Sequence, residues 1–259
     1  SLDCVSVLAL TVPDALGALR VMAGEDPEDP YSRPAPAGCF ETAAPLRGLR
    51  VGVPRPDQRD FFGDREAGRL FASGVQRLAE LGPRVTEVDF EPFRETAELL
   101  YGGPWVAERL AAIEAFLAKS PEALHPVTRE IIEGGRRYSA ADAFRAMYRL
   151  EALRRRTAPC WREMDALAVP TSGTIYTAAE VEADPIRTNT NLGRYTNFAN
   201  LLDLSAIAVP NGMDGRGLPG GITFLAPAFR EGLLCALGEA FQRAGGLPLG
   251  AGANPIPPA

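Results

Sequence analysis

Residues 193–227 read GRYTNFANLLDLSAIAVPNGMDGRGLPGGITFLAP, and this stretch decides the fold. It begins with polar residues and continues through a short apolar run, residues 201–209, which stops at Pro210. A glycine-rich segment follows, and the sequence becomes apolar again at Ile222. Two short apolar runs that flank a Gly/Pro-rich turn are typical of buried strands. The stretch therefore predicts two buried strands with a site-forming loop between them.

A strand–helix–strand unit lies nearer the N-terminus. Residues 49–53 form a short apolar run that Pro54 stops. Asp64 is the expected N-cap of a helix with one apolar stripe, and Gly82-Pro83 ends that helix. Residues 85–90 then alternate as a strand. Because a helix connects them, the two strands are predicted to be parallel, which places the chain in the α/β class.

The remaining segments complete this α/β prediction. Residues 1–10 are expected to be a strand or an extended entry, residues 25–45 a surface loop, and residues 171–190 irregular. Helices are expected after Thr11, from Pro104, over 122–135, over 140–164 behind a Ser139/Asp142 capping box, and over 230–244. Residues 166–170 are a further buried strand. The predicted domain covers 1–246, and the Gly/Pro-rich residues 247–259 are a tail or linker.

Composition excludes several classes of protein. The formal net charge is −6 and Lys119 is the single lysine, which argues against nucleic acid as a partner. No apolar run reaches the roughly 20 residues of a membrane helix, so no membrane association is expected. Four dispersed cysteines predict reduced thiols in a cytoplasmic protein. One histidine and no cysteine pair offer no metal site, and no cofactor is expected. The start at Ser1, without Met, suggests a fragment.

The residues themselves supply no complete catalytic constellation. His125, in a Leu-His-Pro turn, is expected to be a surface residue rather than a triad base. No Gly-x-Ser-x-Gly elbow is present. Gly212, Gly215 and Gly217 lack the lysine of a phosphate loop. We therefore predict no catalytic residue in this chain.

Four segments of the sequence form distinctive motifs: Ser1-Leu2-Asp3-Cys4-Val5-Ser6, Asp29-Pro30-Tyr31-Ser32-Arg33-Pro34, Gly193-Arg194-Tyr195-Thr196-Asn197-Phe198, and Ala208-Val209-Pro210. These motifs resemble those of the amidase signature family and, within it, the allophanate hydrolases. The resemblance extends to about Gly246. It implies a mixed, mostly parallel β-sheet covered by helices, here in part, and a serine nucleophile, a bridging serine and a lysine base.

Those three catalytic residues lie, by the resemblance, upstream of Ser1. Lys119, at a helix end, does not match the family's lysine context. The resemblance thus implies the C-terminal portion of an amidase domain that hydrolyses allophanate to ammonia and carbon dioxide, with this fragment inactive alone. It also implies a small carboxylated amide as the substrate and a homodimer for the intact protein.

The resemblance assigns the substrate-binding wall to Tyr101 and Arg109, which match the tyrosine and arginine that grip the substrate. An arginine fork suits a planar carboxylate. Asn197 is a further substrate-binding candidate, although it could instead hold a loop. The structural alternative for Arg109 is an ion pair with Glu108 or Glu114, or stacking on Trp105.

Two other functions stay open from the sequence. The chain could be a non-catalytic amidase-like module that binds a carboxylated ligand or a partner, or an amidase with another substrate. A further group of arginines is expected to be a solvated helical face, with an interface as the minor alternative. Its members are Arg136, Arg137, Arg145, Arg149, Arg154, Arg155 and Arg156.

Overall fold

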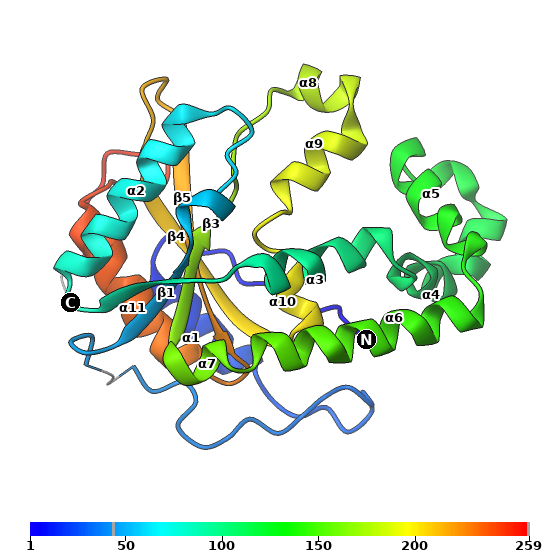
Figure 1. The fold of residues 1–259 in the computed structure, drawn as a ribbon, viewed down its shortest axis with the longest axis horizontal. Coiled ribbons are helices and arrows are strands. Elements are labelled where there is room, and N and C mark those ends of the chain that lie inside the picture. The colour runs from blue at the N-terminus through cyan, green and yellow to red at the C-terminus, as the bar shows by residue number, and fades with distance from the viewer. Residues whose placement is uncertain (43–44, 258–259) are drawn as a thin grey trace.

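One mixed β-sheet organises the chain, whose computed structural model describes residues 1–42 and 45–257. The strands are β1 (Arg50–Pro54), β2 (Arg84–Val88), β3 (Ala166–Pro170), β4 (Leu204–Met213) and β5 (Pro219–Pro227). Their order in the sheet is β2-β1-β3-β5-β4. β1 is parallel to β2 and β3, whereas β5 is antiparallel to both β3 and β4. Only β5 runs against the other described strands, so the predicted mixed, mostly parallel sheet is confirmed (Figure 1).

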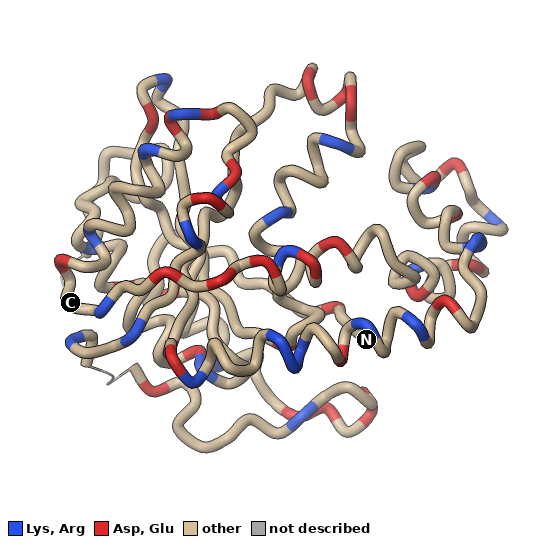
Figure 2. The backbone as a smooth tube through the Cα atoms, viewed as in Figure 1, with Lys and Arg blue, Asp and Glu red and all other residues tan. Residues whose placement is uncertain are grey.

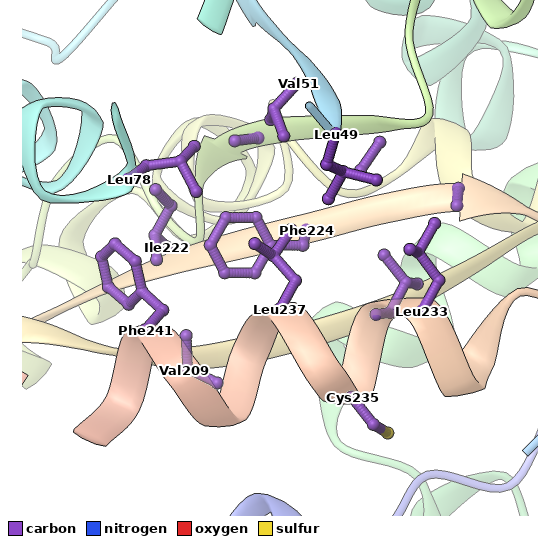
Figure 3. Close-up of a cluster of buried hydrophobic side chains, with 14 of the residues drawn as sticks. Leu49, Val51, Leu78, Val209, Ile222, Phe224, Leu233, Cys235, Leu237 and Phe241 are labelled. Atoms are coloured by element: carbon purple, nitrogen blue, oxygen red, sulfur yellow. The ribbon is translucent and has the colours of Figure 1, made fainter. Parts of the chain in front are cut away.

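Three helices cover one face of the sheet: α1 (Val12–Met22), α2 (Arg65–Glu80) and α11 (Glu231–Gly245). Side chains alternate between the two faces of a strand, and on β5 the residues Ile222 and Phe224 point to this side. Figure 3 shows them packed against Leu237 and Phe241 of α11. The Phe224 and Phe241 rings meet edge-on, with centroids 5.5 Å apart. This cluster is the larger hydrophobic core.

The opposite face carries an aromatic core beneath α3 (Glu91–Gly102), α6 (Ala140–Thr157), α7 (Cys160–Glu163) and α10 (Phe198–Leu201). Phe90, Phe93 and Phe198 are fully buried there, and the Phe90 and Phe198 ring centroids are 5.6 Å apart. Leu225, the neighbour of Phe224 on β5, points into this second core. The alternation along β5 therefore joins both halves of the molecule.

The remaining helices project from these two layers (Figure 1). They are α4 (Trp105–Lys119), α5 (Pro126–Glu133), α8 (Ala178–Ala183), α9 (Pro185–Leu192), and the short 3₁₀ helices η1 (Pro56–Gln58), η2 (Pro121–Ala123) and η3 (Gly134–Arg137). Leu110, Leu117 and Ile132 form a small separate core between α4 and α5. α4, α5 and η3 contact one another and form an outer lobe, which α3 joins to the rest of the chain.

Local capping signals predict the starts of three helices correctly. Thr11 caps α1, Asp64 caps α2, and Ser139 forms a capping box with Asp142 at the start of α6. The β1–α2–β2 unit is parallel, as predicted. The expected helix over 122–135 is shorter, because Pro126 sets the first residue of α5. The expected helix over 140–164 is split into α6 and α7.

Residues 1–10, expected to be a strand or an extended entry, form no strand. Side chains hold their backbone, including Asn200, whose Nδ2 donates to the Leu2 carbonyl at 2.6 Å. The expectation for residues 171–190 is wrong, because α8 and most of α9 lie within them and they are not wholly irregular. Within the predicted loop 25–45, residues 43–44 lie outside the described part of the chain, as do residues 258–259 of the predicted tail.

The arginines of the predicted solvated face are all exposed, and Figure 2 shows basic and acidic positions interspersed along α6. Arg149 and Arg156 of α6 both pair with Glu95 of α3, and Arg154 pairs with Glu151. Exposed pairs of this kind contribute little to stability, about 0–1 kcal/mol each. Among the described residues, no helix combines the length and the apolar character that a bilayer span requires.

The two edges of the sheet differ in charge. β2 forms one edge and carries Arg84 and Glu87, both exposed. β4 forms the other edge, pairs only with β5 among the described strands, and has no charged residue in its ten positions. Ala206, Ala208 and Pro210 are exposed along it. The β4 edge thus lacks the charges that usually keep edge strands apart.

Candidate functional site

The structure brings Tyr101 and Arg109 together at the turn between α3 and α4. Tyr101 is the penultimate residue of α3, and Arg109 lies on the first turns of α4. The Arg109 guanidinium carbon lies 4.7 Å from the centre of the Tyr101 ring. Tyr101 is 44% exposed, so this pair sits at the surface of the chain. The two side chains that the sequence analysis selects therefore face one another.

The turn that joins them depends on Gly103. A Cβ atom there would lie 2.5 Å from the Leu99 carbonyl oxygen and 3.3 Å from the Trp105 ring. The Gly103 N–H donates to the same Leu99 carbonyl at 2.9 Å, which ends α3. Tyr138 donates its hydroxyl to the Gly102 carbonyl at 3.1 Å. These contacts hold Tyr101 within α3, at the turn that leads into α4.

The donors of Arg109 are not taken by the neighbouring acids. Glu108 pairs with the amino group of Ser1, and Glu114 pairs with Arg136 at 2.6 Å. Across residues 1–42 and 45–257, no hydrogen bond or ion pair of the Arg109 side chain is found. Its aromatic contact is with Tyr101 rather than with Trp105. The guanidinium is thus stacked on one face and retains its N–H groups for another partner.

Asn197 contacts its own turn rather than an unpaired charged group. Its backbone N–H donates to the Gly193 carbonyl at 2.9 Å, and its amide packs over Gly193, where a Cβ atom would be 2.4 Å away. The neighbouring polar residues diverge: buried Tyr195 bonds to Asp60, and exposed Asn200 bonds to Leu2. The contacts of Asn197 are those of a residue that holds its own turn.

A small cavity of about 160 Å³ lies at the loop between β4 and β5. That loop, predicted to form a site, supplies Asp214, Arg216 and Leu218 to the wall, and α2 supplies its N-cap Asp64. Thr171, which follows β3, lines the cavity as well. The sequence does not reveal this polar wall, because Asp64 and Arg216 are distant in sequence and only the fold brings them together.

Arg216 is the centre of the polar wall of this cavity. It donates to Asp64 at 3.0 Å and to Asp214 at 2.7 Å. Burial alone would raise the pKa of the Asp64 carboxyl, but hydrogen bonds from the Ala67 N–H, Arg216 and Thr174 outweigh burial and hold that pKa below its usual value. The carboxylate is therefore part of the folded structure in its ionised form.

We expect Asp64→Ala to lower the free energy of unfolding by about 1–3 kcal/mol at neutral pH, because it removes both an N-cap and a largely buried charge partner. Because the pKa of Asp64 is lowered in the folded state, its carboxylate stabilises the fold at pH values above the unfolded-state pKa of about 3.9. This stabilisation is lost as the pH falls through the folded-state pKa. Urea unfolding of wild type and variant should therefore converge as the pH is lowered below about 4. A constant difference would contradict the ionised role of Asp64.

The other candidate residues behave as surface or packing residues. His125 is exposed at the turn before α5, and Lys119 is exposed at the end of α4. The four cysteines are free thiols. Within the described residues, no three His, Cys, Asp or Glu side chains are gathered as metal ligands. Of the residues that the sequence analysis selects, Arg109 keeps unpaired donor groups while it stacks on Tyr101.

Comparisons with a family model and with known proteins agree on one family for this chain. Residues 1–235 match the family model described as Amidase. The chain is 38% identical over 246 residues to urea amidolyase of Saccharomyces cerevisiae, covering 93% of this chain and 13% of that protein. An amidase of Pseudomonas putida is 30% identical over 94% of this chain and 53% of its own length.

A solved structure agrees with the sequence comparisons. Allophanate hydrolase of Kluyveromyces lactis superimposes with a TM-score of 0.87 at 36% identity. The match covers 92% of this chain and 39% of that protein. The chain thus corresponds to well under two thirds of the length of the relatives that it resembles.

Proposed function

The chain belongs to the amidase signature family, and from this we propose that it forms the substrate-carboxylate-binding part of an amidohydrolase that cleaves allophanate to ammonia and carbon dioxide. Allophanate carries an amide to be cut and a carboxylate to be held. In this proposal Arg109 binds the carboxylate and Tyr101 positions the guanidinium. The names of the similar yeast proteins support the choice of substrate.

The observation that carries this proposal is the unpaired guanidinium of Arg109, stacked 4.7 Å from the Tyr101 ring centre. Stacking leaves the edge of the guanidinium available, and that edge matches the two oxygens of a carboxylate. A neutral amide in the same place could not balance the arginine charge. The Tyr101–Arg109 pair is therefore expected to favour a negatively charged substrate over a neutral one. Asn197 is kept as a candidate for substrate contact, although its packing on Gly193 favours a structural role.

We further propose that bond cleavage uses residues outside this chain. By family resemblance these are a serine nucleophile, a bridging serine and a lysine, which would activate the attacking oxygen. Within the 259 residues, Lys119 is exposed at a helix end and remote in sequence from any Gly/Ser-rich stretch. We therefore expect the isolated chain to release no ammonia from allophanate. Release at enzyme-like rates would refute this division of labour.

A matched pair of substrates tests the proposal directly. Biuret has the same backbone as allophanate but carries an amide in place of the carboxylate. We expect the full-length enzyme that contains this chain to show a kcat/KM for allophanate that exceeds its value for biuret by roughly 10²–10⁴-fold. Initial rates of ammonia release measure both. Equal rates would contradict carboxylate selection and favour an amidase with another substrate.

The homodimer, the cytoplasmic location and the 1–246 domain boundary stay predictions.

A further inference from the structure

The carboxyl ends of β1 and β3 form a topological switch point. These strands are parallel neighbours, with Val51 opposite Ala166. The connection from β1 passes through α2 to β2 on one side, whereas β3 leads through α8, α9 and α10 to β4 on the other. In open α/β sheets, ligands bind in the crevice where such connections diverge. The segments that follow β1 and β3 are therefore the expected position of a ligand site.

Residues 60–62, which follow β1, are held in an uncommon conformation there. Phe62 has a φ of 53°, in the left-handed region that a bulky residue rarely adopts. Gly173, which follows β3, makes room for it, because a Cβ atom would lie 2.9 Å from the Phe62 ring and 2.8 Å from the Asp60 carbonyl oxygen. Buried Tyr195 accepts a hydrogen bond from the Asp60 N–H at 2.7 Å and donates to the Asp60 carbonyl at 3.0 Å. Contacts from separate segments of the fold thus fix this loop.

Arg194 lies over that loop, beside the Phe62 and Tyr195 side chains. Its guanidinium carbon is 5.9 Å from the Phe62 ring centre and 6.0 Å from that of Tyr195. Its Nη1 is 3.8 Å from Asp60 Oδ2, beyond hydrogen-bonding distance, and Asp60 Oδ1 is already engaged by the Phe62 N–H at 2.9 Å. Its Nε is buried and has no hydrogen-bond partner among the described residues. A buried donor left unpaired destabilises the fold.

Arg50 shows which group binds the Nε–Nη2 edge of a guanidinium elsewhere in this protein. Its Nε and Nη2 both donate to the carboxylate of Asp165, at 3.1 and 2.7 Å. Arg194 offers the same Nε–Nη2 edge, while its Nη1 faces Asp60 on the other side. Because Asp60 is tied to Phe62, it cannot turn to cover that edge without giving up the Phe62 hydrogen bond.

We propose that the Nε–Nη2 edge of Arg194, beside the loop that follows β1, binds a small planar carboxylate side-on. The Phe62 and Tyr195 rings hold the guanidinium in place, and the carboxylate satisfies the buried Nε. This site differs from the Tyr101–Arg109 pair in its residues and its helices. It does not depend on the proposed amidase substrate.

The ¹⁵N–¹H signals of the arginine Nε groups test this site in the 259-residue chain. Sodium acetate is titrated against sodium chloride at equal ionic strength, and the Arg194 signal is identified by its loss in Arg194→Lys. We expect a saturable shift of the Arg194 Nε–H with acetate and none with chloride. The Arg50 Nε–H, whose edge Asp165 fills, should stay unchanged. A shift shared by both salts, or no shift, would overturn the proposal.

Three variants complete the design. Arg194→Lys keeps the charge but removes the fork, and should weaken acetate binding about tenfold or more, as followed by acetate-induced thermal stabilisation. Asp60→Asn retains the acceptor for the Phe62 N–H, removes the competing charge, and should strengthen binding severalfold. Arg109→Gln should leave the Arg194 shift intact. Loss of that shift in Arg109→Gln, or unchanged binding in Arg194→Lys, would disprove a separate site, whereas failure of the allophanate–biuret comparison would not affect it.

Discussion

Replacing Arg109 with leucine in the full-length enzyme is expected to lower kcat/KM for allophanate by roughly 10²–10⁴-fold and to leave biuret hydrolysis nearly unchanged. A charge-assisted hydrogen bond contributes about 1.5–3 kcal/mol, and a bidentate carboxylate makes two of them. Leucine retains an apolar side chain against Tyr101 but supplies no donor. The two substrates should therefore become similar in their initial rates of ammonia release.

Arg136 provides the matched control for this change. It is an exposed arginine of the same outer lobe, and its guanidinium is already paired with Glu114. Arg136→Leu should leave kcat/KM for both substrates within about twofold, since a surface ion pair contributes little. If both leucine variants lose allophanate turnover equally, the defect lies in the lobe as a whole. Arg109 would then have no particular role in holding the carboxylate.

The second large effect concerns the core beneath α11. Phe224 is fully buried and meets Phe241 edge-on (Figure 3). Phe224→Ala should lower the free energy of unfolding by about 3–5 kcal/mol, because it removes a large buried side chain and leaves a cavity. Urea-induced unfolding, followed by far-ultraviolet circular dichroism, gives the change from the shift of the midpoint.

Phe144 is the natural comparison, because it is 54% exposed on α6. The identical substitution there, Phe144→Ala, should change the free energy of unfolding by no more than about 0.5 kcal/mol. Comparable losses at both positions would show that α6 is covered in solution and that Phe144 belongs to a buried surface. Such a result would contradict the layer arrangement derived for the isolated chain.

Sequence signals located the elements that are specified locally. Thr11, Asp64 and Ser139 each place an oxygen that accepts from the first turn of a helix, and all three helices begin where predicted. The same kind of signal was overlooked at α8. Thr177 and Glu180 form a capping box there, and Asp184 with Pro185 starts α9. Residues 171–190 could therefore have been predicted as partly helical.

Other features depend on contacts distant in sequence. The alternation in residues 1–10 leaves a strand and an extended entry open; no described strand pairs with these residues, and Asn200 holds the backbone at Leu2. Sequence analysis could select Tyr101 and Arg109 only through family resemblance. It could not find Asp60 beside Arg194, because these residues are 134 positions apart and meet only in the folded structure.

The uncharged β4 strand has a practical consequence for handling the protein. Its ten residues include no lysine, arginine, aspartate or glutamate, and Pro210 is the only one without a backbone N–H. A neighbouring molecule could dock its own extended segment along that margin, in the manner of amyloid growth. We therefore expect turbidity to rise with concentration during purification. A single lysine introduced at Ala208, whose side chain is exposed, should keep concentrated samples clear.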